Sequence, residues 1–232
     1  WLGATVAASF LVLIIFGVEI YRTAPPFPTK IVVSDGEVLY EGQDIKDGQN
    51  VWQSMGGQTV GSIWGHGAYI APDWNADYLH RETEMLLELF AQKDGKTYKD
   101  LPEDEQAKYL VQLRKELRTN TYDAASGVIT FSPERAQVAR ALADYYTKLF
   151  MDDPSMDHVR KSYAIPKGAI KDPARMAQMN AFFTWTTWVC STNRPGSDVT
   201  YTNNWPYEPV IGNKPSTSLQ MWSGFSGLML LF

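Results

Sequence analysis

Apolar residues are concentrated at the two ends of the chain. Residues 1–21 carry one charge, on Glu19. A helix rises about 1.5 Å per residue, so about 20 residues cross a hydrocarbon core roughly 30 Å thick. Residues 219–232 are also uncharged and apolar, but this run is too short to span a bilayer by itself. The pattern predicts a transmembrane helix, a large extracytoplasmic domain and the truncated start of a second transmembrane helix, over residues 1–22, 23–216 and 217–232.

A cleaved signal peptide is the alternative for the first segment. Its apolar core would have about 7–15 residues and would end at a cleavage site made of small residues. The run here is longer, and it is followed by Arg22-Thr23-Ala24-Pro25-Pro26, which matches such a site poorly. These features favour a retained helix.

Between the two apolar ends, the pattern predicts a mainly helical domain. Apolar residues recur at helical spacing, as with Leu79, Leu86 and Phe90, after residues that typically cap a helix. Asp73 and Ser132 are two such N-cap candidates. Helices are therefore expected over residues 44–54, 73–93, 102–118, 132–151 and 172–192.

Short β-favouring runs predict a small amount of strand. Residues 30–34 and 37–40 flank Asp35-Gly36, and a D-G turn between two such runs is typical of a β-hairpin. One further strand is expected over residues 127–131. Loops are expected where glycine is frequent or periodicity is lost, over residues 56–67 and 193–215.

Charge and cysteine content narrow the classes of function. The formal net charge is −5. An excess of acidic residues does not give the basic surface that binds nucleic acid, so no nucleic-acid partner is expected. Cys190 is the only cysteine, which leaves no intrachain disulfide framework.

The histidines offer no metal-binding or catalytic motif. His66, His80 and His158 lack the HxxxH and HExxH spacings, and the chain has no CxxC, so a transition-metal site made by this segment alone is not expected. His80-Arg81-Glu82 resembles the start of a kinase catalytic loop only in outline, and a solvated helix face explains it better. We predict no catalytic residue in this segment.

One block of the sequence is distinctive. It begins with Trp52-Gln53, continues through a G-x-G-A-Y string at residues 65–69 and an A-P pair at residues 71–72, and ends at Trp74. The block resembles the heme-attachment region in the small cytochrome c subunit of cytochrome c-dependent nitric oxide reductases. In that family W-Q is followed by C-x-x-C-H, then by G-x-G-A-Y and A-P. At the family's spacing, the two cysteines and the histidine fall on Gly57, Val60 and Gly61.

These three positions hold no thiol to attach a heme and no imidazole to ligate its iron. The chain therefore resembles the quinol-dependent nitric oxide reductases of the heme–copper oxidase superfamily, in which the small subunit is fused to the catalytic one. The strings at residues 65–82 and 185–209 resemble the same enzymes. The resemblance implies a mainly α chain, with a transmembrane helix, a heme-less cytochrome c-like extracytoplasmic domain and the start of a second transmembrane helix.

The resemblance also implies an activity for the whole protein. Two NO would be reduced to N2O and water with electrons from quinol, at a high-spin heme b beside a non-heme iron, with a low-spin heme b as relay. Residues on later transmembrane helices would hold these irons, and this segment would be a structural cap on that heme-bearing domain, without heme c. The expected location is the bacterial inner (cytoplasmic) membrane, with the large domain on the periplasmic side of the lipid bilayer. A homodimer is left open.

In the family, the G-A-Y element helps to hold a calcium ion between the domain and the heme propionates. Gly67 and Tyr69 are therefore candidate contributors, because calcium accepts backbone carbonyl ligands and glycine lets the backbone approach closely. The alternative is a tight loop against the membrane domain without metal contact. His66 and His80 match no iron ligand and are expected to form hydrogen bonds at the interface.

The aromatic stretch Phe182 to Trp188 has two interpretations. It could form a platform for quinol. Aromatic residues that end a helix above a bilayer more often serve core and interfacial contacts, so the second interpretation is favoured.

Two other classes of protein remain as alternatives. A membrane-tethered binding or sensor module with a degenerate cytochrome c fold needs one helix, and the apolar run at residues 219–232 argues against it. A non-catalytic scaffold subunit of a related heme–copper oxidase is the other. The missing cysteines and the string at residues 65–74 favour the reductase.

Overall fold

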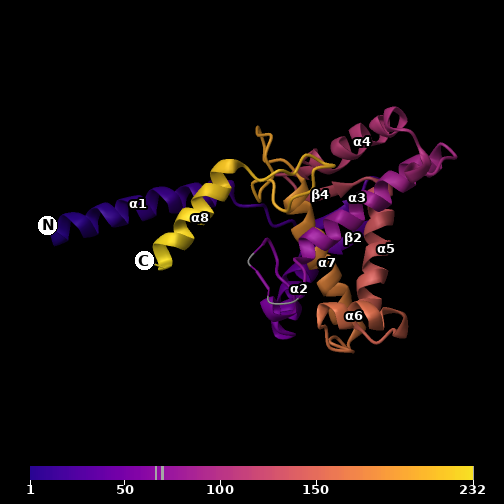
Figure 1. The fold of residues 1–232 in the computed structure, drawn as a ribbon, viewed down its shortest axis with the longest axis horizontal. Coiled ribbons are helices and arrows are strands. Elements are labelled where there is room, and N and C mark those ends of the chain that lie inside the picture. The colour runs from indigo at the N-terminus through magenta and orange to yellow at the C-terminus, as the bar shows by residue number, and fades with distance from the viewer. Residues whose placement is uncertain (66, 69–70, 232) are drawn as a thin grey trace.

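The computed structural model describes residues 1–65, 67–68 and 71–231, and it places a mainly helical domain beside two exposed helices (Figure 1). The exposed helices are α1 (Leu2–Thr23) and α8 (Thr217–Leu231), which leave the domain on the same side (Figure 1). The domain contains α2 (Gly42–Ser54), α3 (Trp74–Lys93), α4 (Glu103–Arg118), α5 (Pro133–Phe150), α6 (Asp157–Tyr163) and α7 (Pro173–Ser191), with short 3-10 turns at η1 (Gly57–Val60), η2 (Tyr98–Asp100) and η3 (Pro154–Met156).

Helix α1 has the length and the surface of a membrane-spanning helix. It has 22 residues and buries none of them within the chain, so side chains such as Phe10 and Ile14 stay exposed. Among the described residues, it is the only helix long and apolar enough to cross a bilayer. Helix α8 confirms that the second apolar run is helical, and its place in a membrane remains a prediction.

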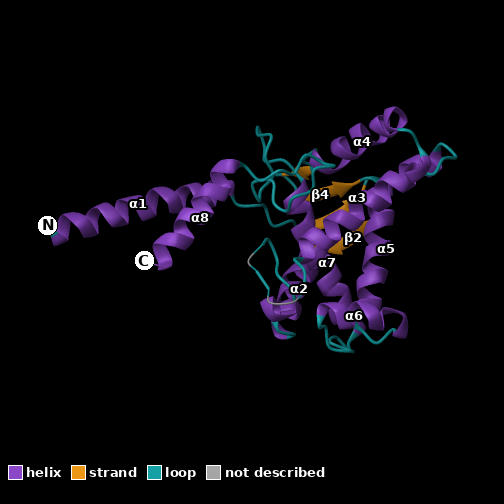
Figure 2. Ribbon diagram, viewed as in Figure 1, coloured by secondary structure: helices purple, strands orange, loops and turns teal. Residues whose placement is uncertain are grey.

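A four-stranded sheet lies beside the helices in the order β2-β1-β4-β3 (Figure 2). Strands β1 (Lys30–Val33) and β2 (Val38–Glu41) form the predicted antiparallel hairpin, whose turn uses Gly36 at φ +95°. Strand β4 (Val128–Phe131) is also confirmed. It pairs with β1 in parallel and with the two-residue strand β3 (Tyr122–Asp123) antiparallel, and the sequence pattern indicated neither pairing.

The two predicted N-caps, Asp73 and Ser132, are confirmed. Asp73 Oδ1 accepts hydrogen bonds from the backbone N–H groups of Asn75 and Ala76, each at 3.0 Å. Ser132 Oγ accepts from the backbone N–H of Arg135 at 3.0 Å. These bonds satisfy backbone donors that a helix start leaves without partners.

Helix α2 begins earlier than expected, at Gly42. The side chains of Glu41 and Asp44 form a reciprocal capping box, which starts the helix two residues before the predicted position.

Helix α6 was not predicted because its seven residues are too few to show a periodic pattern. Its Arg160 is 3% exposed and donates to the backbone carbonyls of Lys148 and Leu149 at 3.0 and 3.1 Å. A cation at the end of α5 satisfies carbonyls that the helix terminus leaves free. Helix α6 therefore closes the end of α5.

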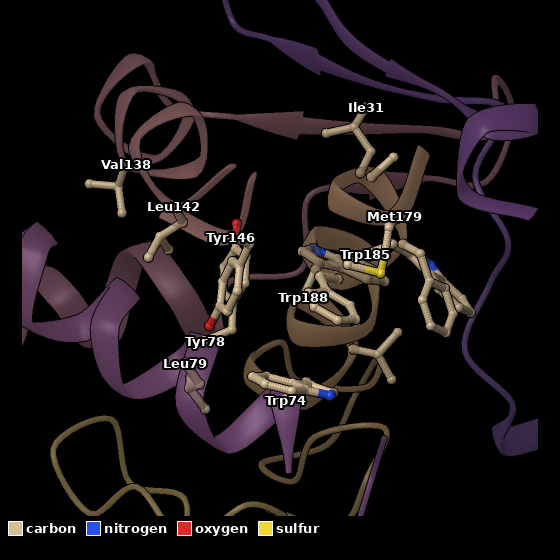
Figure 3. Close-up of a cluster of buried hydrophobic side chains, with 14 of the residues drawn as sticks. Ile31, Trp74, Tyr78, Leu79, Val138, Leu142, Tyr146, Met179, Trp185 and Trp188 are labelled. Atoms are coloured by element: carbon tan, nitrogen blue, oxygen red, sulfur yellow. The ribbon is translucent and has the colours of Figure 1, made fainter. Parts of the chain in front are cut away.

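Helix α7 runs through the centre of the domain and contacts α2, α3 and α5. Every residue from Met179 to Thr192 is buried, as expected for a helix that is covered on all sides. Trp74 and the stacked pair Tyr78 and Tyr146, with ring centroids 5.6 Å apart, lie in the same core (Figure 3). The interpretation of residues 182–188 as core aromatics is therefore supported.

One ion pair is buried in this core. Glu82 Oε1 accepts from Arg135 Nε at 2.9 Å, and Arg135 Nη2 also donates to Ser191 Oγ at 3.1 Å. The two charged side chains are 2% and 3% exposed. Burial raises the pKa of the Glu82 carboxyl, against the opposing effect of the Arg135 guanidinium. The ion pair joins α3 to α5, and the hydrogen bond from Arg135 to Ser191 connects both helices to α7.

We expect Arg135→Met to lower the free energy of unfolding by about 3–5 kcal/mol, because it leaves the Glu82 carboxyl buried without its counter-charge. The double variant Glu82→Leu, Arg135→Met removes both charges and should recover most of that loss. Urea unfolding in detergent, followed by circular dichroism, measures both values. Equal losses in the single and double variants would contradict this explanation.

Candidate functional site

The segment from Trp52 to Trp74 carries the distinctive motif. Its described residues form the end of α2, the turn η1 and a stretch that is held against the start of α3. Asp73 organises the loop. Its Oδ2 accepts from Ser62 Oγ at 2.8 Å and from the Gly65 backbone N–H at 2.6 Å, while its Oδ1 caps α3. One carboxylate therefore fixes both the loop and the helix start.

Asn75 fixes the same loop to α7. It is fully buried, and its Oδ1 accepts from the Trp64 backbone N–H at 3.0 Å. Its Nδ2 donates to Thr186 Oγ1 at 2.8 Å, and Trp64 Nε1 donates to the Thr186 carbonyl at 3.1 Å. The contacts with Thr186 join residues more than 100 positions apart, and no local sequence pattern indicated them.

The position that corresponds to the heme-ligating histidine has no room for a side chain. Gly61 adopts φ +126°, and a Cβ placed there would lie 2.0 Å from Trp74 Nε1. The Trp74 indole is held in place because Nε1 donates to the Val60 carbonyl at 2.9 Å. An imidazole at residue 61 would therefore have to displace the indole.

The two positions that correspond to the cysteines of the family motif do not fit a covalently attached heme either. Gly57 and Val60 carry no sulfur. The one thiol of the chain, Cys190, is fully buried in α7, and burial raises its pKa well above the usual range. A buried, protonated thiol is neither a good nucleophile nor a metal ligand.

A cavity of about 410 Å³ lies between α2, η1 and α7, and we call it the aromatic pocket. The ring centroids of Phe27 and Trp185 are 4.6 Å apart, those of Trp64 and Trp185 are 5.8 Å apart, and those of Trp52 and Phe182 are 6.2 Å apart. The pocket is lined by Phe27, Gln49, Trp52, Gln58, Ile63, Trp64, Phe182 and Trp185.

The predicted calcium contributors are only partly described by the structure. Gly67 is exposed, adopts φ +83° and has open space around a Cβ placed on it. Tyr69 and His66 lie outside the described residues. Among the residues that are described, no group of three or more His, Cys, Asp and Glu side chains could hold a metal ion. The calcium site therefore remains a prediction.

His80 forms a hydrogen bond, as expected, but with a partner that the sequence did not indicate. Its Nδ1 lies 3.0 Å from Oε2 of Glu208, a residue that is 6% exposed. This contact joins α3 to the irregular segment at residues 193–215, which leads into α8. Whether the histidine also meets another domain stays a prediction.

Comparison with known protein families gives one match. Residues 28–207 match the family of the NorB cytochrome c-like domain, which belongs to nitric oxide reductase. The match begins after α1 and ends before α8, and it covers every helix and strand of the domain between them. No curated protein matches the chain.

We expect Gly61→Ala to lower the free energy of unfolding by about 2–6 kcal/mol. Backbone strain at a positive φ contributes about 1–3 kcal/mol, and a methyl group forced against the Trp74 indole adds about 1–3 kcal/mol. Gly36→Ala is the matched control, because Gly36 also has a positive φ but has open space around it. Urea unfolding of both variants in detergent tests this. A loss at residue 61 no larger than that at residue 36 would rule out the steric contact.

Proposed function

Since the chain belongs to the family of the NorB cytochrome c-like domain of nitric oxide reductase, we propose that it is the N-terminal part of a nitric oxide reductase that takes its electrons from quinol. In the proposed reaction, one quinol gives two electrons and two protons to two NO, which yields N2O, one water and the quinone. The observation that carries the choice of donor is the residue set Gly57, Val60 and Gly61, which provides neither thiol nor imidazole.

The chemistry of this segment supports a donor in the membrane. A soluble cytochrome passes its electron to a heme that lies near the surface of the reductase. The residues at the three motif positions do not fit such a heme, and Trp74 occupies the space beside Gly61. Quinol and NO both partition into a bilayer, so the acidic domain, with its net charge of −5, need not attract either one.

The proposed role of the domain is structural. It covers the heme-bearing transmembrane domain of the same protein on the periplasmic side of the bacterial inner membrane. The direction in which α1 and α8 leave the domain supports this role, because it turns one side of the domain toward the membrane (Figure 1). Asp73 and Asn75 hold the backbone of Gly65 and Trp64 in place, which offers these residues as part of a contact surface. A homodimer is compatible with this arrangement.

The cofactors belong mainly to the part of the protein beyond this domain. We propose a low-spin and a high-spin heme b and a non-heme iron there, which would relay electrons and bind NO. In this segment, the proposed contribution is to calcium, through Gly67 and Tyr69. Gly67 fits because it is exposed and carries no side chain that would keep a cation from its backbone.

Anaerobic NO consumption by the whole enzyme tests the proposed donor. With its hemes shown to be present by their spectra, the enzyme should consume NO with reduced decylubiquinol and should not do so with reduced soluble cytochrome c. The reason is that this chain offers no heme to the soluble protein.

Two results would contradict the proposal. Turnover with cytochrome c would mean that the protein has another route for electrons. No NO consumption with either donor, in protein that carries its hemes, would favour a membrane-tethered binding or scaffold module.

A further inference from the structure

We propose that a cavity beside α4 binds a small zwitterion of the amino-acid class. The cavity has a volume of about 430 Å³ and is lined by residues of α4, of β4 and of the start of α5. This volume falls within the range of about 300–1,000 Å³ that is usual for small-molecule sites. We call it the α4 cavity. A ligand here is independent of which molecule gives electrons to the whole protein.

Two neighbouring residues of α4 bring one charge of each sign to the α4 cavity. Lys115 lines it, is exposed and forms no ion pair with the described residues. Its ammonium group ends a flexible stem of four carbons, so it can turn toward a ligand. Glu116 also lines the cavity, and its Oε1 accepts from Ser132 Oγ at 2.7 Å. Its Oε2 has no hydrogen-bond partner among the described residues, so a ligand group can take that place.

The third charged residue that lines the α4 cavity, Arg135, adds little to this balance. Its guanidinium is 3% exposed and already pairs with the Glu82 carboxylate at 2.9 Å. Because these two charges offset each other, Lys115 and Glu116 decide which ions the cavity attracts. A simple anion would be repelled by Glu116, and a simple cation by Lys115. A ligand with one charge of each sign can pair with both.

Hydroxyl groups supply much of the remaining polar surface of the cavity. Thr121 Oγ1 is buried and has no hydrogen-bond partner. A polar atom in this state costs free energy, and turning the hydroxyl toward a bound ligand would recover part of that cost. A hydroxyl both donates and accepts, so it suits the oxygens of a carboxylate and the N–H groups of an ammonium. The hydroxyl-bearing residues that line the cavity are Ser34, Thr119, Thr121, Thr130 and Ser132.

The walls of the α4 cavity argue against a sugar as the ligand. A sugar ring has an apolar face, which gains free energy from contact with an apolar or aromatic surface. Among the described residues that line the cavity, Phe131 is the only aromatic one, and it is 1% exposed. The Arg135 guanidinium covers it, 4.4 Å from the centroid of its ring. An amino acid needs no such surface for its two charged groups.

The place of the α4 cavity in the fold favours a water-soluble ligand. Helices α4 and α5 lie on the side of the domain away from α1 and α8 (Figure 1). With α1 in a bilayer, the cavity therefore lies away from the membrane. Amino acids are small and soluble in water, so they can reach it by diffusion.

Two variants remove the proposed charges without changing the core. Lys115→Met removes an exposed ammonium group, and Glu116→Gln keeps an oxygen that can accept from Ser132 Oγ. Lys161→Met is the matched control. Lys161 is an exposed lysine of α6 that forms no ion pair with the described residues and does not line the cavity. Circular dichroism melting curves show whether the three variants keep the fold.

Saturation-transfer NMR on the whole protein in detergent measures the binding of glycine, L-alanine and L-glutamine. We expect saturable binding of at least one of them. Binding should be lost when its amine is acetylated or its carboxylate is amidated, and glucose should not bind. The Kd should rise at least about tenfold in Lys115→Met and in Glu116→Gln, because each variant removes one charge-assisted contact with the ligand. It should stay unchanged in Lys161→Met.

Three results would overturn the proposal. The absence of saturable binding for all three amino acids would exclude a zwitterion at this site. Equal binding of the blocked analogues, or binding of glucose alone, would mean that the two charges do not recognise the ligand. A Kd that is the same in all three variants would place the ligand outside the α4 cavity.

Discussion

The indole of Trp74 joins the loop after α2 to the centre of the domain, and the arrangement of the motif segment depends on it. It is fully buried, and its Nε1–H bond to the Val60 carbonyl holds the loop from one side. Its ring meets those of Tyr146, Phe150 and Phe183, with centroids 5.1–6.1 Å apart, which brings α5 and α7 to the same point. Because the indole occupies this position, residue 61 has to be glycine.

The local features of the fold could be predicted from the sequence, and the long-range ones could not. Caps such as Asp73 and Ser132 act on backbone groups two or three residues away, so their effect is visible in a short string. The parallel pairing of Lys30 with Val128 joins strands nearly 100 residues apart, and no local pattern specifies it. The bond between His80 and Glu208 spans 128 residues and was missed for the same reason.

In the candidate site, too, the local features could be predicted from the sequence and the long-range ones could not. The sequence identified the motif positions and the absence of their thiols and imidazole. It could not show the positive φ of Gly61 or the closeness of the Trp74 indole, because both depend on how α3 meets the loop. The aromatic residues of α7 were expected in the core, which the structure supports. The fact that Phe182 and Trp185 also form a wall of a cavity depends on α2 and on the residues after α1.

The hydrogen bond from Trp185 to the Pro26 carbonyl has a mechanical consequence. Pro26 lies three positions after the end of α1, while Trp185 belongs to the buried central helix. The contact between the rings of Phe27 and Trp185 joins the same two segments. A membrane helix changes its tilt when the thickness of the surrounding bilayer changes. With α1 in a bilayer, this joint would carry part of such a tilt into the domain as torque, so lipid composition would act on the shape of the aromatic pocket.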